Sequence, residues 1–427
     1  MSGSARRLLL IAFHFPPIQG STGVTRTLAF AKYLRDCGWE VTVLTAHPRA
    51  YPESRAENLA IIPPHVRVER AAAFDTRRHL SLAGKYPLAL AVPDRWQSWI
   101  AGGFLRARRV IRQWRPDVIM STYPIASAHY LGHMVHKWSG LPWVADFRDP
   151  MAQEGYPPEP RLQRAYQRIE QHVFASAARV IATTAGTAEL YRERFPAFPA
   201  ANIVVIPNGF DDELFPAPTG TPPAARPERR KLSLLHSGVL YPSERDPLEF
   251  FAAVAELRDA GALRAEDVEF RLRATGHDEL YAPRLEQFRL NDLVRLLPPV
   301  PYKEALAEMS AVDACMVFQG SNCNQQVPAK VYEYLYAGRP VLGLAEPAGD
   351  TGRLLADFGI RHIVSLHDRA AIRQLLPGFL AELRADSIEP VERGRVLGFS
   401  RRATTRSLGE LLDGVLSQRQ LPSRSMP

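Results

Sequence analysis

Short apolar runs alternate with helical patterns along most of this chain. Residues 8–13 form an almost wholly apolar run, residues 24–37 follow with helical spacing, and residues 40–45 form a second run. Strands that are apolar on both faces are typical of parallel sheets covered by helices. The alternation therefore predicts an α/β fold built from doubly wound parallel sheets.

The length of 427 residues exceeds one ordinary hydrophobic core and predicts two domains. A proline-rich segment near the middle of the chain marks the boundary between them. The predicted divisions are a first Rossmann-like domain over residues 1–206, a hinge and linker over 207–230, a second Rossmann-like domain over 231–395, a C-terminal helix within 396–418, and a disordered tail over 419–427.

Composition narrows the class of protein. Apolar residues make up 46% of the chain and charged residues 23%, which is typical of a soluble globular protein. Cys37, Cys315 and Cys323 show no C-x-x-C spacing, so we expect a reducing, cytoplasmic setting. No run approaches the ~20 apolar residues of a spanning helix.

The net charge of +8 favours anionic partners such as nucleoside diphosphates or an anionic membrane face. Nucleic acid is not expected, because zinc-finger spacing and RNP-like aromatic signatures are absent from the sequence. Residues 102–115 combine arginines with an apolar face. Such a helix either lies on the inner face of the membrane or covers a sheet with its arginines in solvent.

Residues 324–341 read as a polar loop, a helix opened by Pro328 and closed by Gly338, and a strand. Lys330 lies in the first turn, where its charge opposes the helix dipole. Together with the N–H groups of the helix start, Lys330 could hold a phosphate. The alternative is a surface ion pair between Lys330 and Glu333, three residues apart.

Two stretches resemble a known family. The runs PAKVYEYLYAGRPV and FPPIQGSTGVTRTLAFAKYLRDCGWEVTVLT are similar to the retaining, family 4 glycosyltransferases of the GT-B fold. The resemblance implies two Rossmann-like domains facing a cleft, the first on the acceptor side and the second binding a nucleotide sugar. It also implies that the last helix packs back onto the first domain.

The activity implied is transfer of a sugar from a nucleotide diphosphate donor to an acceptor hydroxyl, in bacterial surface glycan or glycolipid assembly. The acceptor would be a glycan or a lipid-linked glycan. No cofactor is expected, since the nucleotide sugar is a co-substrate. Two alternatives remain open, a sugar-nucleotide epimerase of the same fold and a nucleotide-sugar-binding protein without turnover.

The resemblance also implies roles on the donor side. Glu333 matches the glutamate that holds the ribose hydroxyls, whereas Gln325 stands where the family has a second acid. Gly238 matches a glycine near the diphosphate. Arg245 takes the position of a lysine in the diphosphate clamp, and Val239 replaces the arginine of that clamp. Arg245 and Lys330 are therefore the cations predicted to stabilise the leaving diphosphate.

The remaining candidates come from loops that follow strands. Gly20 and Gly23 lie in a loop where the family's backbone approaches donor or acceptor. Asp149, and after it Asp146, are candidates for handling the acceptor proton, because both follow the strand 141–145. A local Arg148–Asp149 turn contact is the alternative. A last pair is placed near the donor sugar by position alone: Asp350 and Thr351.

No metal site is predicted. A D-x-D pair occurs nowhere in the sequence, so a metal-bridged diphosphate is not expected. His129, His133 and His136 have the spacing of one helix face, but they lack the glutamate of an H-E-x-x-H motif.

Overall fold

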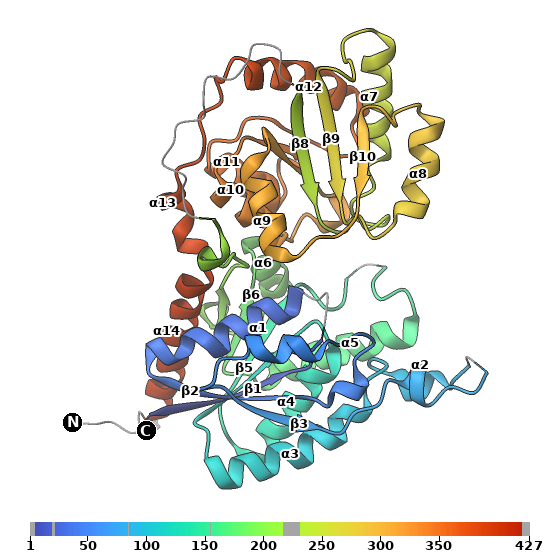
Figure 1. Cartoon of the computed structure of the whole chain (residues 1–427). Coiled ribbons are helices and arrows are strands. Elements are labelled where there is room, and N and C mark those ends of the chain that lie inside the picture. Colours follow the sequence, from blue (N-terminus) through green and yellow to red (C-terminus); the bar gives the residue numbers. More distant parts are fainter. Residues whose placement is uncertain (1–4, 19–21, 84, 154, 217–230, 421–427) are drawn as a thin grey trace. The chain divides into compact units, whose positions relative to one another are not determined.

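The computed structural model describes residues 5–18, 22–83, 85–153, 155–216 and 231–420, which form two compact units (Figure 1). Unit 1 contains residues 1–208 and 401–427, and unit 2 contains residues 209–400. The chain therefore passes between the units twice, after Asn208 and after Ser400. Most of the predicted linker and most of the predicted tail lie outside the described residues.

Seven parallel strands form the sheet of unit 1. They are β1 (Arg6–Ala12), β2 (Trp39–Ala46), β3 (Arg67–Ala71), β4 (Val118–Thr122), β5 (Trp143–Arg148), β6 (Arg179–Ala182) and β7 (Ile203–Val205). Their order is β3-β2-β1-β4-β5-β6-β7, and all neighbouring pairs are parallel. The winding reverses between β1 and β4, and ligands bind at such a switch point in this class of sheet.

Helices cover both faces of this sheet. They are α1 (Thr22–Tyr33), α2 (Thr76–His79), α3 (Ser98–Trp114), α4 (Ala126–Ser139), α5 (Pro160–Ser176), α6 (Ala185–Arg194) and α14 (Arg401–Gln420). Successive residues of β1 enter opposite cores: Leu9 and Ile11 join one apolar cluster, while Leu8 and Leu10 join the other. A strand buried on both faces explains why the first apolar run shows no alternation with polar residues.

Unit 2 repeats the same plan. Its strands are β8 (Leu232–Ser237), β9 (Val268–Arg273), β10 (Val294–Leu297), β11 (Ala314–Phe318), β12 (Val341–Leu344) and β13 (Ile363–Val364). The order β10-β9-β8-β11-β12-β13 places its winding reversal between β8 and β11. Its helices are α7 (Leu248–Asp259), α8 (Asp278–Gln287), α9 (Tyr302–Ala311), α10 (Ala329–Ala337), α11 (Asp350–Asp357), α12 (Arg369–Arg384) and α13 (Arg393–Val396). The predicted α/β class, with two doubly wound parallel sheets, is confirmed.

Two segments, β3 and α3, show what the sequence pattern left open. Strand β3 lies at the edge of the sheet, and its charged sequence RVERA has no apolar run that would mark it as a strand. The basic helix lies in α3, whose Trp99, Ala107 and Val110 are buried in the core of unit 1. Helix α3 therefore covers the sheet, the second of the two alternatives. In the described ranges every helix is too short or too polar to cross a bilayer.

The last helix, α14, belongs to unit 1 although unit 2 precedes it in sequence (Figure 1). Leu408 and Leu412 are fully buried in the apolar cluster that contains Leu8 and Leu10 of β1. The indole Nε1 of Trp39 donates a 3.0 Å hydrogen bond to the Asp413 carboxylate. Unit 1 is thus built from both ends of the chain.

A glycine pair in α14 tests this docking. A methyl group added at Gly409 would lie 2.9 Å from Cys37 Cβ and 3.1 Å from its Sγ, whereas one added at Gly414 would meet no atom within 4 Å. We expect Gly409→Ala to lower the free energy of unfolding by about 1–3 kcal/mol through overpacking. The matched Gly414→Ala should raise it by about 0.5–1 kcal/mol through helix propensity. Urea unfolding measures both, and equal effects would contradict the docking of α14.

Candidate functional site

The start of α10 is held at the switch point of unit 2. The helix begins at Ala329, so Pro328 is the residue before the first helical position and not the first position itself. Gly338 ends the helix in the left-handed conformation (φ 68°), as predicted. Val331, Tyr334 and Leu335 are fully buried and fix the helix against the sheet. Its first turn is therefore rigidly placed.

Lys330 projects from this first turn toward the end of β8. Its Nζ lies 3.0 Å from Nε2 of His236, the fifth residue of β8. Burial first, and then the neighbouring Arg245 guanidinium, lower the pKa of Lys330 to about 7, against the opposing effect of the Glu333 carboxylate. Lys330 is thus a cation kept beside another cation, in a place where its charge is costly. The surface ion pair considered from the sequence does not describe this arrangement.

Gly238 makes the position of Lys330 possible. Its φ of 121° is a backbone conformation that side chains rarely adopt. A Cβ at this position would lie 2.7 Å from Lys330 Nζ and 3.2 Å from its Cε. The ammonium group therefore packs against the glycine backbone, and the structure brings these two predicted site residues together.

Arg245 is the second cation of this group. Its side chain is 15% exposed, and the nearest carboxylate, that of Glu244, lies 3.9 Å from Nη2. The buried Nε has no hydrogen-bond partner among the described residues. Two adjacent cations, one with an unsatisfied N–H, beside a helix start form an arrangement that an anion would neutralise. Chemically, this group can bind a phosphate or diphosphate.

Glu333 lies on the same helix and is 9% exposed. Its Oε1 accepts a 2.6 Å hydrogen bond from the hydroxyl of Tyr302, the first residue of α9. Sequence reasoning did not identify Tyr302, because the residue that it contacts, Glu333, is 31 residues away along the chain. A carboxylate oxygen can accept more than one hydrogen bond, which suits Glu333 to the predicted contact with ligand hydroxyls.

The other predicted donor-side residues lie around the loop that precedes α10. Gln325 is partly buried there, and the Asp350 N–H donates a 2.7 Å bond to the Asn324 carbonyl. The Thr351 hydroxyl lies 2.8 Å from Gln319 Oε1 and 3.0 Å from the Gln326 carbonyl oxygen. Thr351 is only 1% exposed and fixes this loop from inside. Its place near the donor sugar stays a prediction.

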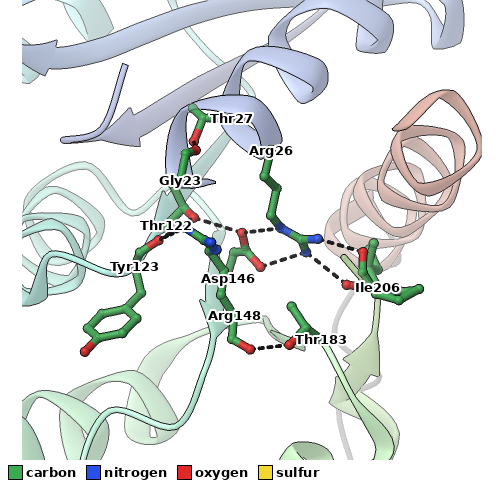
Figure 2. Close-up of polar contacts among 10 residues, drawn as sticks. Gly23, Arg26, Thr27, Thr122, Tyr123, Asp146, Arg148, Thr183 and Ile206 are labelled. Carbon is green, nitrogen blue, oxygen red and sulfur yellow. Dashed lines mark hydrogen bonds and ion pairs between the residues drawn. The ribbon is translucent and has the colours of Figure 1, made fainter. Parts of the chain in front are cut away.

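In unit 1, Asp146 ends up in a buried ion pair (Figure 2). Its two carboxylate oxygens accept bonds of 3.1 and 3.0 Å from Nε and Nη2 of Arg26, and Thr122 donates a third of 2.8 Å. Arg26 also donates to the carbonyls of Ile206 and Pro207. Asp146 is fully buried, and its role as a proton acceptor stays a prediction. It joins β5, α1 and the end of β7.

Asp149, the first-ranked candidate, remains partly exposed at the end of β5. The preceding Arg148 has a left-handed backbone (φ 63°), and its guanidinium reaches back toward α1. A Cβ at Gly23 would lie 2.9 Å from both Arg148 Nη1 and His14 Nδ1. Gly23 therefore leaves room for the side chains of Arg148 and His14, and sequence reasoning had assigned no role to His14. Gly20 lies outside the described residues.

Histidines play separate structural roles in unit 1. Burial, and then the charge of Arg148, lower the pKa of His14 to about 4, so its ring is neutral near pH 7. His129 Nδ1 lies 2.8 Å from Ser121 Oγ, His133 Nδ1 lies 3.2 Å from Ser176 Oγ, and His136 Nδ1 lies 2.7 Å from the Leu141 carbonyl. The helical spacing of these last three does not gather them around one point.

The chain is similar to known proteins in part of its sequence and in its fold. Residues 21–209 match the glycosyl transferase 4-like domain. The chain is 33% identical over 201 residues to a D-inositol 3-phosphate glycosyltransferase of Geodermatophilus obscurus. That match covers 44% of this chain and 42% of the relative, so the chain spans less than half of the relative's length.

Two solved structures are similar over almost the whole chain. Sucrose-phosphate synthase of Thermosynechococcus elongatus has a TM-score of 0.68 and 16% identity, covering 97% of this chain and 100% of that chain. Anabaena Alr3699/HepE, solved with UDP-glucose, has a TM-score of 0.65 and 14% identity, covering 96% and 99%. This chain has the GT-B fold, with a family 4-like first domain. In GT-B terms, Lys330, Arg245 and Gly238 lie in the second domain, and Gly23 and Asp149 lie in the first.

The pKa of Lys330 predicts a pH-dependent anion site in the second GT-B domain. As pH rises from about 6 to 9, Lys330 loses its proton, so affinity for inorganic pyrophosphate should fall by up to about tenfold per pH unit above 7. In the control variant Lys330→Arg, the side chain keeps its charge over this range. Any pH dependence of its affinity therefore comes from the protonation of pyrophosphate. Calorimetric titration of both proteins gives the difference. Parallel profiles would show that Lys330 does not titrate in this range.

The ion pair in the first GT-B domain predicts a loss of stability on truncation. Asp146→Ala leaves Arg26 as an uncompensated buried cation and should cost about 3–5 kcal/mol of unfolding free energy. The double variant Arg26→Met/Asp146→Leu removes both charges and should lose clearly less than the two single variants combined. Urea unfolding provides the comparison. A loss below about 1 kcal/mol in Asp146→Ala would contradict a structural role of the ion pair and favour a role of Asp146 in the chemistry.

Proposed function

We propose that this protein is a glycosyltransferase that moves a sugar from a nucleoside diphosphate donor to an acceptor hydroxyl. The observation that carries the proposal is the pair of adjacent cations, Lys330 and Arg245, at the switch point of unit 2 beside Gly238. A nucleotide sugar presents two phosphates that would neutralise both cations. The similarity to Anabaena HepE, solved with UDP-glucose, supports a donor of this class.

The reaction breaks the bond between the anomeric carbon and the diphosphate oxygen and forms a bond from that carbon to the acceptor oxygen. Negative charge grows on the leaving diphosphate, so preorganised cations and N–H groups lower the barrier. In the proposed roles, Lys330, Arg245 and the start of α10 take this charge. Glu333, held by Tyr302, accepts bonds from the ribose hydroxyls, and Gln325 contacts the donor sugar.

On the acceptor side, Asp149 is the proposed group that receives the hydroxyl proton. By the family resemblance, the backbone at Gly20 and Gly23 is proposed to approach the donor or the acceptor. Retention at the anomeric carbon follows from the family resemblance. The proposal further places the enzyme in the cytoplasm, at the inner face of the membrane, in the assembly of surface glycans or glycolipids. The net charge of +8 is compatible with that anionic surface.

The deciding assay measures free nucleoside diphosphate, with and without acceptor. A panel of UDP-, GDP-, ADP- and dTDP-sugars is incubated with the protein and a set of lipid-linked or soluble glycans. A transferase releases nucleoside diphosphate only when an acceptor is present. An epimerase would change the donor sugar without an acceptor, and a binding protein would turn over neither, so each outcome selects one of the three functions.

Removal of the lysine tests the chemistry. Lys330→Ala should lower kcat by about 10²–10³, because the lost charge acts most strongly as the leaving group develops. Lys303→Ala, an exposed lysine at the start of α9 in the same unit, should leave kcat unchanged. Steady-state kinetics on both variants, after circular dichroism confirms folding, makes the comparison. Normal turnover by Lys330→Ala would remove this helix from the active site.

The proposed reaction needs no metal ion, and removal of metals with a chelator tests this. Because two side-chain cations are available to the diphosphate, activity should persist in excess EDTA. The assay is the same release of nucleoside diphosphate, before and after dialysis against chelator. Complete loss of turnover that Mg²⁺ or Mn²⁺ restores would show that the two cations are insufficient.

A further inference from the structure

His236 is a buried histidine that contacts Lys330 at the proposed phosphate site. It is the fifth residue of β8 and has no exposed surface. Its ring packs edge-on against Phe318 of β11, with ring centroids 5.1 Å apart and an angle of 85° between the planes. The next residue is fixed as well, since the Ser237 N–H donates a 2.8 Å bond to the Tyr334 hydroxyl. The imidazole therefore has a single well-defined orientation.

The contacts of the ring define its tautomer. Nδ1 lies 2.9 Å from the carbonyl oxygen of Met316 on β11. A carbonyl oxygen only accepts hydrogen bonds, so Nδ1 carries the proton and donates it. In the neutral ring Nε2 then carries a lone pair, and Lys330 Nζ lies 3.0 Å from it. Lys330 is the donor in this bond, and His236 is the acceptor.

The surroundings keep the ring neutral. Burial, followed by the charge of Lys330, lowers the pKa of His236 well below its usual value, and Arg245 adds to the effect. A protonated ring would place a second N–H against the ammonium group, which has only donors to offer. The charged groups around this pair are Arg245 from the loop after β8 and Glu333 from α10.

The contacts of Lys330 with His236 and Gly238 restrict the motion of its side chain. A lysine side chain is long and flexible, and a ligand that fixes it must overcome its rotamer entropy. The repulsion from Arg245 would also drive the ammonium group toward solvent. The lone pair of His236 on one side and the Gly238 backbone on the other leave Nζ in one place.

We propose that His236 is a positioning residue of the diphosphate site, whose neutral imidazole holds the Lys330 ammonium group against Gly238 before the donor binds. The inference deepens the proposed function and rests on it. His236 itself has no exposed surface and contacts no ligand. It acts through Lys330, because a preorganised cation needs no rearrangement as charge develops on the diphosphate.

Two substitutions separate the two bonds of the ring. His236→Asn can still donate to the Met316 carbonyl but is too short to reach Lys330, whereas His236→Gln can offer its carbonyl oxygen near the position of Nε2. With UDP and inorganic pyrophosphate as probes, we expect His236→Asn to raise Kd by about tenfold to a hundredfold, the range for one hydrogen bond to a charged group. His236→Gln should recover most of this loss. The midpoint of the pH profile should also fall in His236→Asn, because the protonated amine loses its acceptor.

A double-mutant cycle distinguishes positioning from general support of the fold. In the Lys330→Ala background, His236→Asn should have no further effect on Kd, because the group that it positions is gone. An equal loss in both backgrounds would overturn the proposal, as would a normal Kd in His236→Asn. If circular dichroism shows that His236→Asn does not fold, the same cycle is run with His236→Gln. A His236→Gln variant whose Kd is as high as that of Lys330→Ala overturns the inference.

The same titrations separate this inference from the proposed function. If the unaltered protein binds none of the nucleoside diphosphates or pyrophosphate, the proposed function fails and the role of His236 fails with it. If Lys330→Ala weakens binding but His236→Asn does not, only the inference about His236 fails. Inorganic pyrophosphate lacks base and sugar, so it tests the phosphate contacts alone.

Discussion

The ammonium group of Lys330 lies between an imidazole nitrogen and a glycine backbone, next to a second cation. Burial and Arg245 oppose this charge more strongly than the Glu333 carboxylate favours it. Three features nevertheless maintain it: the left-handed backbone of Gly238, the fixed tautomer of His236 and the buried face of α10. Because two like charges at the switch point repel each other, an anion that binds there would relieve this repulsion.

Unit 1 also buries a cation, but there a carboxylate neutralises its charge. There the buried arginine, Arg26, meets a full carboxylate partner in Asp146, and Thr122 completes the group. Charge is neutralised inside the unit, so the pair serves to join α1, β5 and the end of β7. The two doubly wound sheets therefore differ: unit 1 pairs its buried arginine with a carboxylate, and unit 2 holds two cations side by side. Asp149, three residues after Asp146, is more exposed, and it is the residue proposed to handle the acceptor proton.

Local patterns allowed much of this to be predicted. The apolar runs located most strands because a strand buried on both faces cannot alternate, and Pro328 and Gly338 bracketed α10 to within a residue. The edge strand β3 was not predicted, because its sequence is charged and an edge strand need not be apolar. The ion pair of Asp146 was not predicted, for a different reason. A carboxylate after a strand looks the same in sequence whether it faces a ligand or an arginine 120 residues away.

The sequence by itself determined the α/β class, the position of the second sheet, and the candidates Lys330, Gly238 and Arg245, since these depend on local spacing and on a family motif. Only the tertiary structure decided which candidates meet and in what state. Tyr302 reaches Glu333, and His236 reaches Lys330 across 94 residues, through strand order and helix packing. The lowered pKa of Lys330 likewise depends on burial and on Arg245. Such effects arise from distances in space, and no spacing along the chain encodes them.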